Sequence, residues 1–310
     1  MDTPKISVLI PLYNAENFIA QAIESVLNQT FTDFELIIVD NCSTDRSITI
    51  ARQYESDKRV KIFQNSENIG AVRNWNQCML YASGEYLKFL FADDYFKENA
   101  LEEFIKPFES DPSISLVIGP REYLSADGSL NRVPETFTGF KKGIEVINEM
   151  VSATLDHLGE PSFIMIKKNL NIGLFNTHML WLGDIDYPLR ICETGNVFGI
   201  KEYCVVFRRH QQQITADMMK SGAFFNDDRN FHYYNFFIRA SGLKEKYPAY
   251  YQSIWKNIRF HLYRTSYRQQ KEYLKIWPAW LSVRIRLYLF CHNIYRAIKR
   301  LKKRLMVWNL

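Results

Sequence analysis

Two adjacent carboxylates, Asp93 and Asp94, follow the apolar run at residues 86–91. Mg²⁺ and Mn²⁺ prefer oxygen ligands, and proteins commonly hold them with one or two carboxylates together with the phosphates of a substrate. Neighbouring residues on an extended backbone point to opposite sides, so one carboxylate can face a metal while the other faces a substrate hydroxyl. The pair therefore predicts a divalent-cation site for a phosphorylated ligand, with a solvated turn or a helix N-cap as the alternative.

The glycine-rich loops that most often grip phosphates are absent from the sequence. No G-x-G-x-x-G follows the first apolar run, and no G-x-x-x-x-G-K-[ST] occurs in the chain. A carboxylate-bound cation would supply another way to hold a diphosphate.

The elements that must position these residues alternate along the first 120 residues. Strands are predicted at 6–10, 35–39, 60–63, 86–90 and 115–118, and helices at 16–28, 45–55, 71–82 and 98–109. Strands that are apolar on both faces and separated by helices indicate a mostly parallel sheet covered on each side. We therefore expect a doubly wound α/β fold. Ligands bind beyond the carboxyl ends of such strands, where polar turns follow at 11–14, 40–45, 65–70 and 92–94.

Five motifs, in this order and spacing, resemble the family 2 glycosyltransferases. They are ISVLIPLYN at 6–14, SVLNQT at 25–30, ELIIVDNCSTD at 35–45, NIG at 68–70 and ADD at 92–94. The resemblance covers about the first hundred residues and fades between about 110 and 210. It implies a Rossmann-like GT-A fold and the inverting transfer of a sugar from a nucleoside diphosphate sugar.

The resemblance also implies roles for residues of the nucleotide site. Pro11, Tyr13 and Asn14 match the turn that lines the base pocket, and Asp40 matches the acid that hydrogen-bonds the base. Arg73 falls where the family often has a basic residue near the diphosphate. An aspartate can accept from a base N–H, a tyrosine ring can pack on a base, and a guanidinium pairs well with phosphate. Plain packing is the alternative for Tyr13, and an ordinary surface position is the alternative for Arg73.

For the metal, Mn²⁺ or Mg²⁺, the resemblance implies that Asp94 is a ligand and that Asp93 lies nearer the ribose and donor sugar. His210 belongs to an Arg-x-His element whose histidine approaches the metal or the diphosphate, and imidazole can ligate Mn²⁺. A structural role is the alternative for this histidine. Phe91 stands where many members have a further aspartate, which reduces the number of acidic ligands.

An inverting transfer needs a base for the acceptor hydroxyl. The segment at 181–190 resembles the family's Glu-Asp segment at the start of a helix, and Asp184 matches the catalytic aspartate. Gly183 replaces the usual glutamate, and Asp186 is a rival for the role. Helix capping is the alternative for both aspartates.

The cellular location is predicted from what the sequence lacks. Its five cysteines are far apart without a C-x-x-C pair, which favours a reducing cytosol over a disulfide framework or a zinc site. The first residues do not form a signal peptide, and no window of about 18 apolar residues predicts a spanning helix. We therefore expect a cytoplasmic protein.

Charge divides the chain at about residue 243. Residues 244–310 hold sixteen Lys and Arg against two Glu, a balance of +14, so residues 1–243 carry −9 of the total of +5. We expect a catalytic domain at 1–243, with a nucleotide-binding half at about 1–110 and an acceptor half at about 111–243. A basic, aromatic and helical extension is expected at 244–310.

Aromatic residues are interleaved with Lys and Arg throughout 244–310, as in helices that lie in a membrane interface against anionic headgroups. We expect this extension to attach the protein peripherally to the cytoplasmic face of the inner membrane. Packing on the catalytic domain or on a second subunit is the alternative. Nucleic acid is not expected as a partner, because the body is acidic and carries the nucleotide-sugar motifs.

These observations lead to one expected function and two rivals. The resemblance favours an inverting glycosyltransferase. Its expected acceptor is a growing, lipid-linked glycan of a bacterial surface polysaccharide. A nucleotide-sugar-binding assembly protein without turnover is the alternative, because Phe91 and Gly183 replace acidic residues. A nucleotidyltransferase would want a glycine-rich, basic loop after the first strand, which residues 11–14 do not supply.

Overall fold

The computed structural model describes residues 3–133, 137–153, 158, 160–177 and 183–210. The predicted domain boundary at residue 243, the helical extension at 244–310 and its membrane contact lie outside the described residues. In the part of the chain that is described, no helix is long and apolar enough to cross a bilayer.

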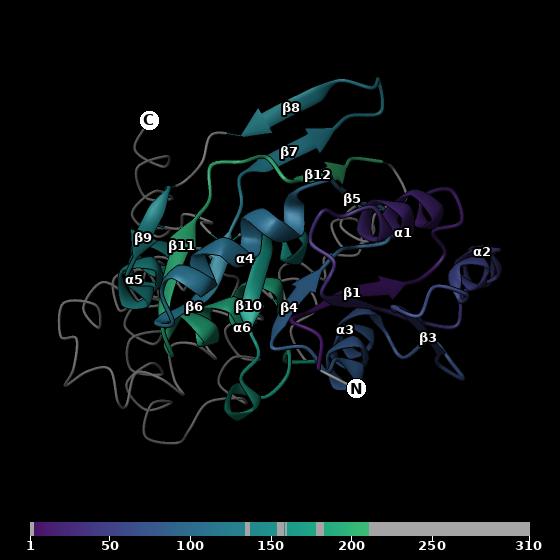
Figure 1. Cartoon of the computed structure of the whole chain (residues 1–310), viewed down its shortest axis with the longest axis horizontal. Coiled ribbons are helices and arrows are strands. Elements are labelled where there is room, and N and C mark those ends of the chain that lie inside the picture. The colour runs from purple at the N-terminus through teal and green to yellow at the C-terminus, as the bar shows by residue number, and fades with distance from the viewer. Residues whose placement is uncertain (1–2, 134–136, 154–157, 159, 178–182, 211–310) are drawn as a thin grey trace, which may run out of the picture. The chain divides into compact units, whose positions relative to one another are not determined.

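The main sheet is built around β1 (Ile6–Leu12), which pairs in parallel with β2 (Phe34–Asp40) on one side and with β4 (Tyr86–Phe89) on the other. β3 (Val60–Gln64) continues the parallel pairing beyond β2. Within the described residues, the order of the eight strands is β3-β2-β1-β4-β10-β6-β11-β9 (Figure 1). The chain runs outward from β1 to β3 and then returns to the other side of β1. Ligands of open α/β sheets bind at such a reversal, beyond the carboxyl ends of the strands.

The other half of the sheet is mixed in direction. β10 (Ile164–Lys167) runs antiparallel to β4 and to β6 (Ile114–Ile118). β11 (Asn196–Gly199) is parallel to β6, and β9 (Gly139–Lys141) is antiparallel to β11. The predicted doubly wound α/β fold is confirmed. β10 begins only at Ile164, because Pro161–Phe163 form a 3-10 turn, η2.

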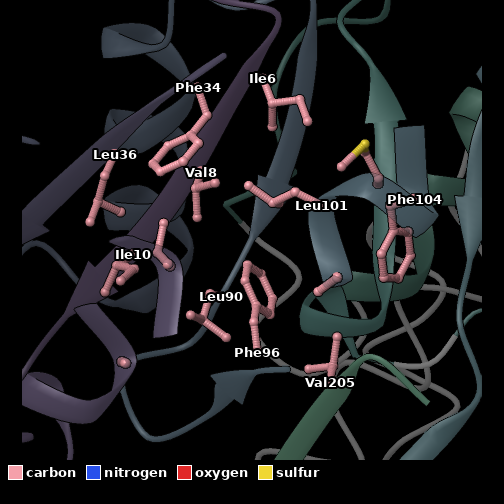
Figure 2. Packing of buried hydrophobic residues seen from close by; sticks show 14 of the residues in the cluster. Ile6, Val8, Ile10, Phe34, Leu36, Leu90, Phe96, Leu101, Phe104 and Val205 are labelled. Carbon is pink, nitrogen blue, oxygen red and sulfur yellow. The ribbon is translucent and has the colours of Figure 1, made fainter. Parts of the chain in front are cut away.

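Helices cover both faces of the sheet because the central strands, such as β1 and β2, are buried on both sides. One hydrophobic cluster contains residues of α1 (Ile19–Leu27), α2 (Ser47–Ala51) and α4 (Ala100–Ser110), and the other contains residues of α3 (Ala71–Tyr81), α5 (Gly143–Ala153) and α6 (Gly183–Cys192). The remaining short turns are η1 (Arg52–Tyr54) and η3 (Leu170–Ile172). Within β1, Ile6, Val8 and Ile10 belong to the first cluster (Figure 2), whereas Leu9 belongs to the second. This alternation follows from the pleat of a strand.

A second sheet connects the acidic turn to the last described residues. Among the described residues, its strand order is β5-β12-β7-β8, with β5 at Tyr95–Phe96, β12 at Val205–Arg208, β7 at Arg121–Leu124 and β8 at Leu130–Val133. β12 runs antiparallel to β5, so the residues that follow β12 lie beside those that precede β5. This pairing brings His210 to the turn of Asp93 and Asp94.

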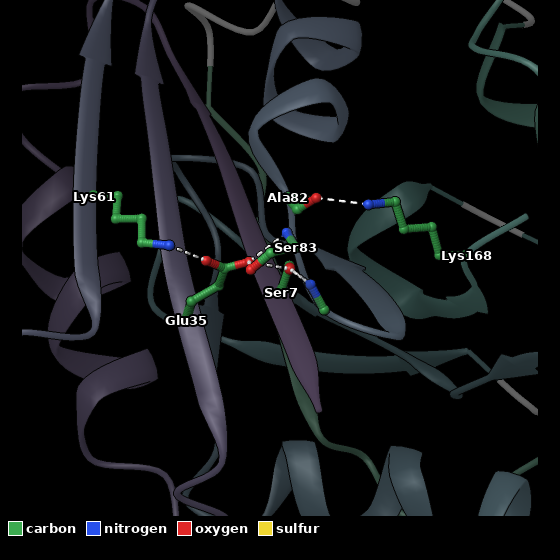
Figure 3. A network of polar contacts seen from close by, with 7 residues as sticks. Ser7, Glu35, Lys61, Ala82, Ser83 and Lys168 are labelled. Atoms are coloured by element: carbon green, nitrogen blue, oxygen red, sulfur yellow. Dashed lines mark hydrogen bonds and ion pairs between the residues drawn. The ribbon is translucent and has the colours of Figure 1, made fainter. Parts of the chain in front are cut away.

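A buried carboxylate ties the strands together at the end of the sheet opposite the predicted ligand edge (Figure 3). Glu35 accepts hydrogen bonds from the Ser7 hydroxyl at 2.6 Å, from the Ser83 N–H at 2.6 Å and from Lys61 Nζ at 2.6 Å. The Gly84 N–H donates to the Ser7 hydroxyl at 2.8 Å, and a Cβ on Gly84 would lie 2.6 Å from the Ser7 nitrogen. β1, β2, β3 and the turn before β4 are therefore joined by one polar network.

Burial alone would raise the pKa of the Glu35 carboxyl, but the hydrogen bonds from Lys61, Ser7 and Ser83 outweigh it. The pKa therefore lies below its ordinary value of 4.5. A carboxylate with a lowered folded-state pKa stabilises the fold fully above the unfolded-state value, and this contribution is lost as the pH falls through the folded-state pKa.

Glu35→Gln is expected to lower the free energy of unfolding by about 1–3 kcal/mol near neutral pH, because the amide replaces an ionised acceptor. Urea unfolding of both proteins from neutral pH into acid should show a difference that narrows once the pH falls below the unfolded-state value of 4.5. Glu85→Gln is the control, because Glu85 is half exposed in its ion pair with Lys5 and should contribute at most about 1 kcal/mol. A Glu35→Gln difference that does not change with pH would contradict the prediction.

Candidate active site

The turns that follow β1 and β2 are hydrogen-bonded to each other at the carboxyl edge of the sheet. The Asn14 N–H donates to Ser43 Oγ at 3.0 Å, and the Thr44 N–H donates to Asn14 Oδ1 at 2.8 Å. Asn14 has a φ of 46°, in the left-handed region that asparagine tolerates better than most residues. Pro11 is half-buried, whereas Tyr13 is 42% exposed. The Tyr13 ring is therefore open to a ligand at this edge.

Asp40 is fully buried at the end of β2. Its carboxylate accepts from Ser43 Oγ at 2.5 Å and from Gln64 Nε2 at 3.0 Å. Asp40 thus holds the turn after β2 and the end of β3 in place, in addition to the base contact predicted for it.

An asparagine network, absent from the sequence predictions, fixes the loop at 65–70 and the start of α3. Asn65 donates to Asn41 at 3.1 Å and to Asn74 at 2.9 Å, Asn41 donates to Asn68 at 2.8 Å, and Asn74 donates to the Val39 carbonyl at 2.9 Å. Asn41 and Asn74 are 3% and 2% exposed, so these amides need their partners.

Arg73 lies in the first turn of α3, directly beyond this asparagine network, and is exposed. The helix starts after Gly70, whose φ of 86° and ψ of 156° suit glycine almost alone. The guanidinium of Arg73 is therefore carried on a backbone that the loop at 65–70 fixes.

Asp93 and His210 face each other at the site. His210 Nε2 lies 3.0 Å from Asp93 Oδ2, and the two side chains are 22% and 25% exposed respectively. The His210 ring packs on Phe18, with ring centroids 4.8 Å apart. The two groups form a direct hydrogen bond or ion pair, and their separation is also compatible with two neighbouring ligands of an octahedral cation at about 2.1 Å.

Asp94 is 1% exposed and is held on both carboxylate oxygens. Ser162 Oγ donates to Oδ2 at 2.7 Å, and the Arg208 N–H donates to Oδ1 at 3.2 Å. Burial raises the pKa of Asp94 well above its ordinary value, and the nearby charge of Asp93 raises it further. Asp93 is therefore the more accessible of the two carboxylates, whereas Asp94, the metal ligand predicted from the sequence, is buried.

Within the described residues, no group of three or more His, Cys, Asp and Glu side chains could hold a metal ion. Asp93 and His210 would supply only two protein ligands, so a cation here would need further oxygens from a ligand. The oxygens of a diphosphate are suited to this, since Mg²⁺ is commonly bound by one or two carboxylates plus substrate phosphates.

The two aspartates of α6 differ in their surroundings. Asp186 is fully buried and accepts from Arg190 Nε at 2.9 Å, and Arg190 donates to the carbonyls of Ile172 and Leu174 at 2.6 and 2.8 Å. Asp186 therefore helps to join α6 to the segment after η3. Asp184 lies in the first turn of the helix and is half-buried, which leaves it better suited than Asp186 to meet an acceptor.

The family model described as Glycosyl transferase family 2 matches residues 7–174, more than half of the chain. The chain is 32% identical over 218 residues to the protein MT1568 of Mycobacterium tuberculosis, covering 67% of each. It is 29% identical over 228 residues to the Escherichia coli UDP-Glc:alpha-D-GlcNAc-diphosphoundecaprenol beta-1,3-glucosyltransferase WfgD, covering 71% of this chain and 83% of WfgD.

The similarity to some other relatives is shorter. The putative teichuronic acid biosynthesis glycosyltransferase TuaG of Bacillus subtilis is 42% identical over 101 residues, and the match spans 32% of this chain and 40% of TuaG.

Among solved structures, TarS 1-349 of S. aureus in complex with UDP shares the fold with a TM-score of 0.58 at 17% identity, covering 87% of this chain and 78% of the TarS 1-349 chain. The GT-A fold expected from the motifs is thereby confirmed. Because the family model extends over more than half of its length, the chain belongs to glycosyl transferase family 2.

Proposed function

We propose that the chain transfers a sugar, with inversion, from a nucleoside diphosphate sugar to a hydroxyl of a glycan. The observation that carries the proposal is the Asp93–His210 pair, which lies at the carboxyl edge of the sheet where open α/β folds bind nucleotides. Membership of the glycosyltransferase family supports the same reaction.

The donor is proposed to be a uridine diphosphate sugar. TarS was solved with UDP and with UDP-GlcNAc, and WfgD carries UDP-Glc in its name. On this chain, Tyr13 would cover the base beside Asp40, and Arg73 would pair with the diphosphate.

In the proposed reaction, Asp93 and His210 would hold Mn²⁺ or Mg²⁺ against the diphosphate. A bound cation supplies Lewis-acid stabilisation of the charge that develops on the leaving diphosphate. Asp184 would take the proton of the acceptor hydroxyl as the oxygen attacks the anomeric carbon from the face opposite the diphosphate.

The acceptor is proposed to be a lipid-linked glycan of a bacterial surface polysaccharide. WfgD is named for a diphosphoundecaprenol-linked acceptor, and TuaG is named for teichuronic acid biosynthesis. An acceptor in the membrane fits the basic and aromatic composition of residues 244–310, which we propose to attach the protein peripherally to the cytoplasmic face of the membrane.

A protein that binds nucleotide sugars without turnover is the second candidate. Phe91 and Gly183 replace acidic residues of the family pattern, and this favours binding over catalysis. The two candidates share the nucleotide site and differ only in whether transfer follows binding.

Donor binding is expected to depend on metal through Asp93 and His210. UDP-, GDP- and dTDP-sugars are titrated calorimetrically with Mn²⁺ and with chelator. The UDP-sugars should bind more tightly with Mn²⁺ than with chelator. Asp93→Asn and His210→Ala should each weaken Mn²⁺ binding by more than the roughly 10–100-fold typical of losing an outer partner of a metal ligand. Equal binding with Mn²⁺ and with chelator would exclude the metal site. Glu85→Gln removes an exposed carboxylate on the opposite edge and should bind like the wild type.

Asp184→Asn is expected to lower kcat by about 10²–10⁴-fold with donor affinity unchanged, because only proton removal is lost. Asp186→Asn is the matched variant on the same helix. It should lower the free energy of unfolding by about 1–3 kcal/mol through the contact with Arg190, while kcat changes much less. Transfer rates with a lipid-linked acceptor and urea unfolding measure both. If the Asp184→Asn kcat equalled that of the wild type while kcat fell for Asp186→Asn, the assignment of the base would be reversed.

Membrane attachment is tested by floating the full chain with vesicles. It should float with vesicles rich in anionic lipid and not with neutral ones, and added salt should release it, because Lys and Arg side chains attract an anionic surface. A version without residues 270–310 should lose flotation and keep donor binding. Loss of donor binding in this truncated form, or salt-independent flotation, would contradict attachment by this segment.

A further inference from the structure

Lys88 is a fully buried lysine in the middle of β4, whose other side chains are also buried. Its Nζ donates to the carbonyl oxygens of Ser162 and of Ile164, the latter at 3.2 Å, and lies 4.1 Å from the centroid of the Phe104 ring and 5.1 Å from that of Phe96. Both carbonyl acceptors and both rings stabilise a cation, against the effect of burial, which lowers the pKa of Lys88 well below its ordinary value.

A buried charge of this kind adds little to stability. Desolvating an ammonium costs several kcal/mol, and apolar residues of similar volume often replace buried ionic groups without loss of stability. β4 lies among strands packed on both faces, where an apolar residue would serve the core equally well. The presence of Lys88 at this position therefore calls for a role beyond packing, at Ser162, whose carbonyl its ammonium holds.

Ser162 links Lys88 to the acidic turn. The carbonyl of Ser162 accepts from Lys88, its Oγ donates to Asp94 Oδ2 at 2.7 Å, and its Oγ accepts from the Phe91 N–H at 3.1 Å. Ser162 is itself fully buried, in η2, immediately before β10. One residue from the antiparallel half of the sheet therefore contacts the start of the turn through Phe91 and its end through Asp94.

The contacts form a chain from the core to the site. Lys88 fixes the backbone of Ser162, the Ser162 hydroxyl fixes the Asp94 carboxylate, and Asp94 also accepts from the backbone N–H of Arg208, two residues before His210. Asp93, the neighbour of Asp94, meets His210 at 3.0 Å. A shift of Ser162 would be passed to both sides of the Asp93–His210 pair.

We propose that Lys88 is a positioning residue for the transfer reaction, which it serves by holding Ser162 so that the Ser162 hydroxyl sets the orientation of the Asp93–Asp94 turn. The inference rests on the proposed function of this site. It assigns to Lys88 and Ser162 an effect on the geometry of the turn, with no contact to the donor sugar or the acceptor.

A double-mutant cycle tests the proposal with Lys88→Met, Ser162→Ala and the double variant. Methionine keeps most of the volume of lysine and removes the charge, and alanine removes only the hydroxyl. We measure kcat and KM for the donor, Mn²⁺ affinity of the protein with UDP bound by electron paramagnetic resonance, and the thermal unfolding midpoint. Each single variant should lose at least about 10-fold in Mn²⁺ affinity and in kcat/KM, the range found for partners that orient metal ligands. The double variant should lose no more than Lys88→Met, because both changes break one chain of contacts.

Lys61→Met is the matched control, because it also removes a lysine that holds a buried group, Glu35, at the opposite end of the strands. It should lower the unfolding midpoint and leave kcat/KM and Mn²⁺ affinity unchanged. A purely structural role of Lys88 would give the same pattern as Lys61→Met and would overturn the proposal. Additive losses in the double variant would overturn it as well.

If Lys88→Met does not fold, Ser162→Ala decides alone, and unchanged Mn²⁺ affinity and kcat/KM in that variant would refute the chain of contacts. The proposed function fails separately, when the wild-type protein neither binds a nucleotide sugar nor transfers from it. A wild-type enzyme that transfers sugar, with Lys88→Met and Ser162→Ala equally active, would remove this inference and leave the function in place.

Discussion

The candidate site depends on a short antiparallel contact between β5 and β12. Asp93 and His210 are 117 positions apart in the chain, yet their side chains meet at 3.0 Å, because β5 begins just after the acidic turn and β12 ends just before the histidine. Val205 pairs with Phe96, and both are buried in the first hydrophobic cluster. A slip of one residue in this pairing would turn the side chains of β12 to the other face of the sheet. The geometry of the polar pair is thus set by the packing of apolar residues beside it.

Much of the amino-terminal half could be predicted from the sequence. Continuous apolar runs separated by helical patterns predict parallel strands with helices on both faces, and β1 to β4 follow that pattern closely. The polar turns after these strands were placed on one edge, and Asn14 and Ser43 indeed bridge two of them. These features depend on local periodicity and on a general rule of α/β topology, so one sequence is enough to predict them.

The rest depends on contacts between segments far apart in the chain, for which a single sequence gives no local signal. The antiparallel direction of β10 and the contact of Ser162 with Asp94 are of this kind. The burial of Asp94 could not be predicted either, because it depends on the contacts of Asp94 with Ser162 and with the backbone of Arg208. Lys88 did leave a signal, a lysine within an apolar run, but its meaning required the position of residue 162.

The polar network of Glu35 lies at the amino ends of the strands, whereas the turns that face ligands lie at the carboxyl ends. The residues of the stabilising Glu35 network are thereby separated from the residues of the proposed substrate site. Exposed positions of the carboxyl-end turns, such as Tyr13 and Arg73, can change without disturbing that anchor, while Asp40 and Asn41 cannot, since they are buried and hold neighbouring turns. Evolution or design of a new donor or acceptor specificity on this fold is therefore expected to change exposed residues of these turns. The buried amides and carboxylates that hold the turns are expected to stay the same.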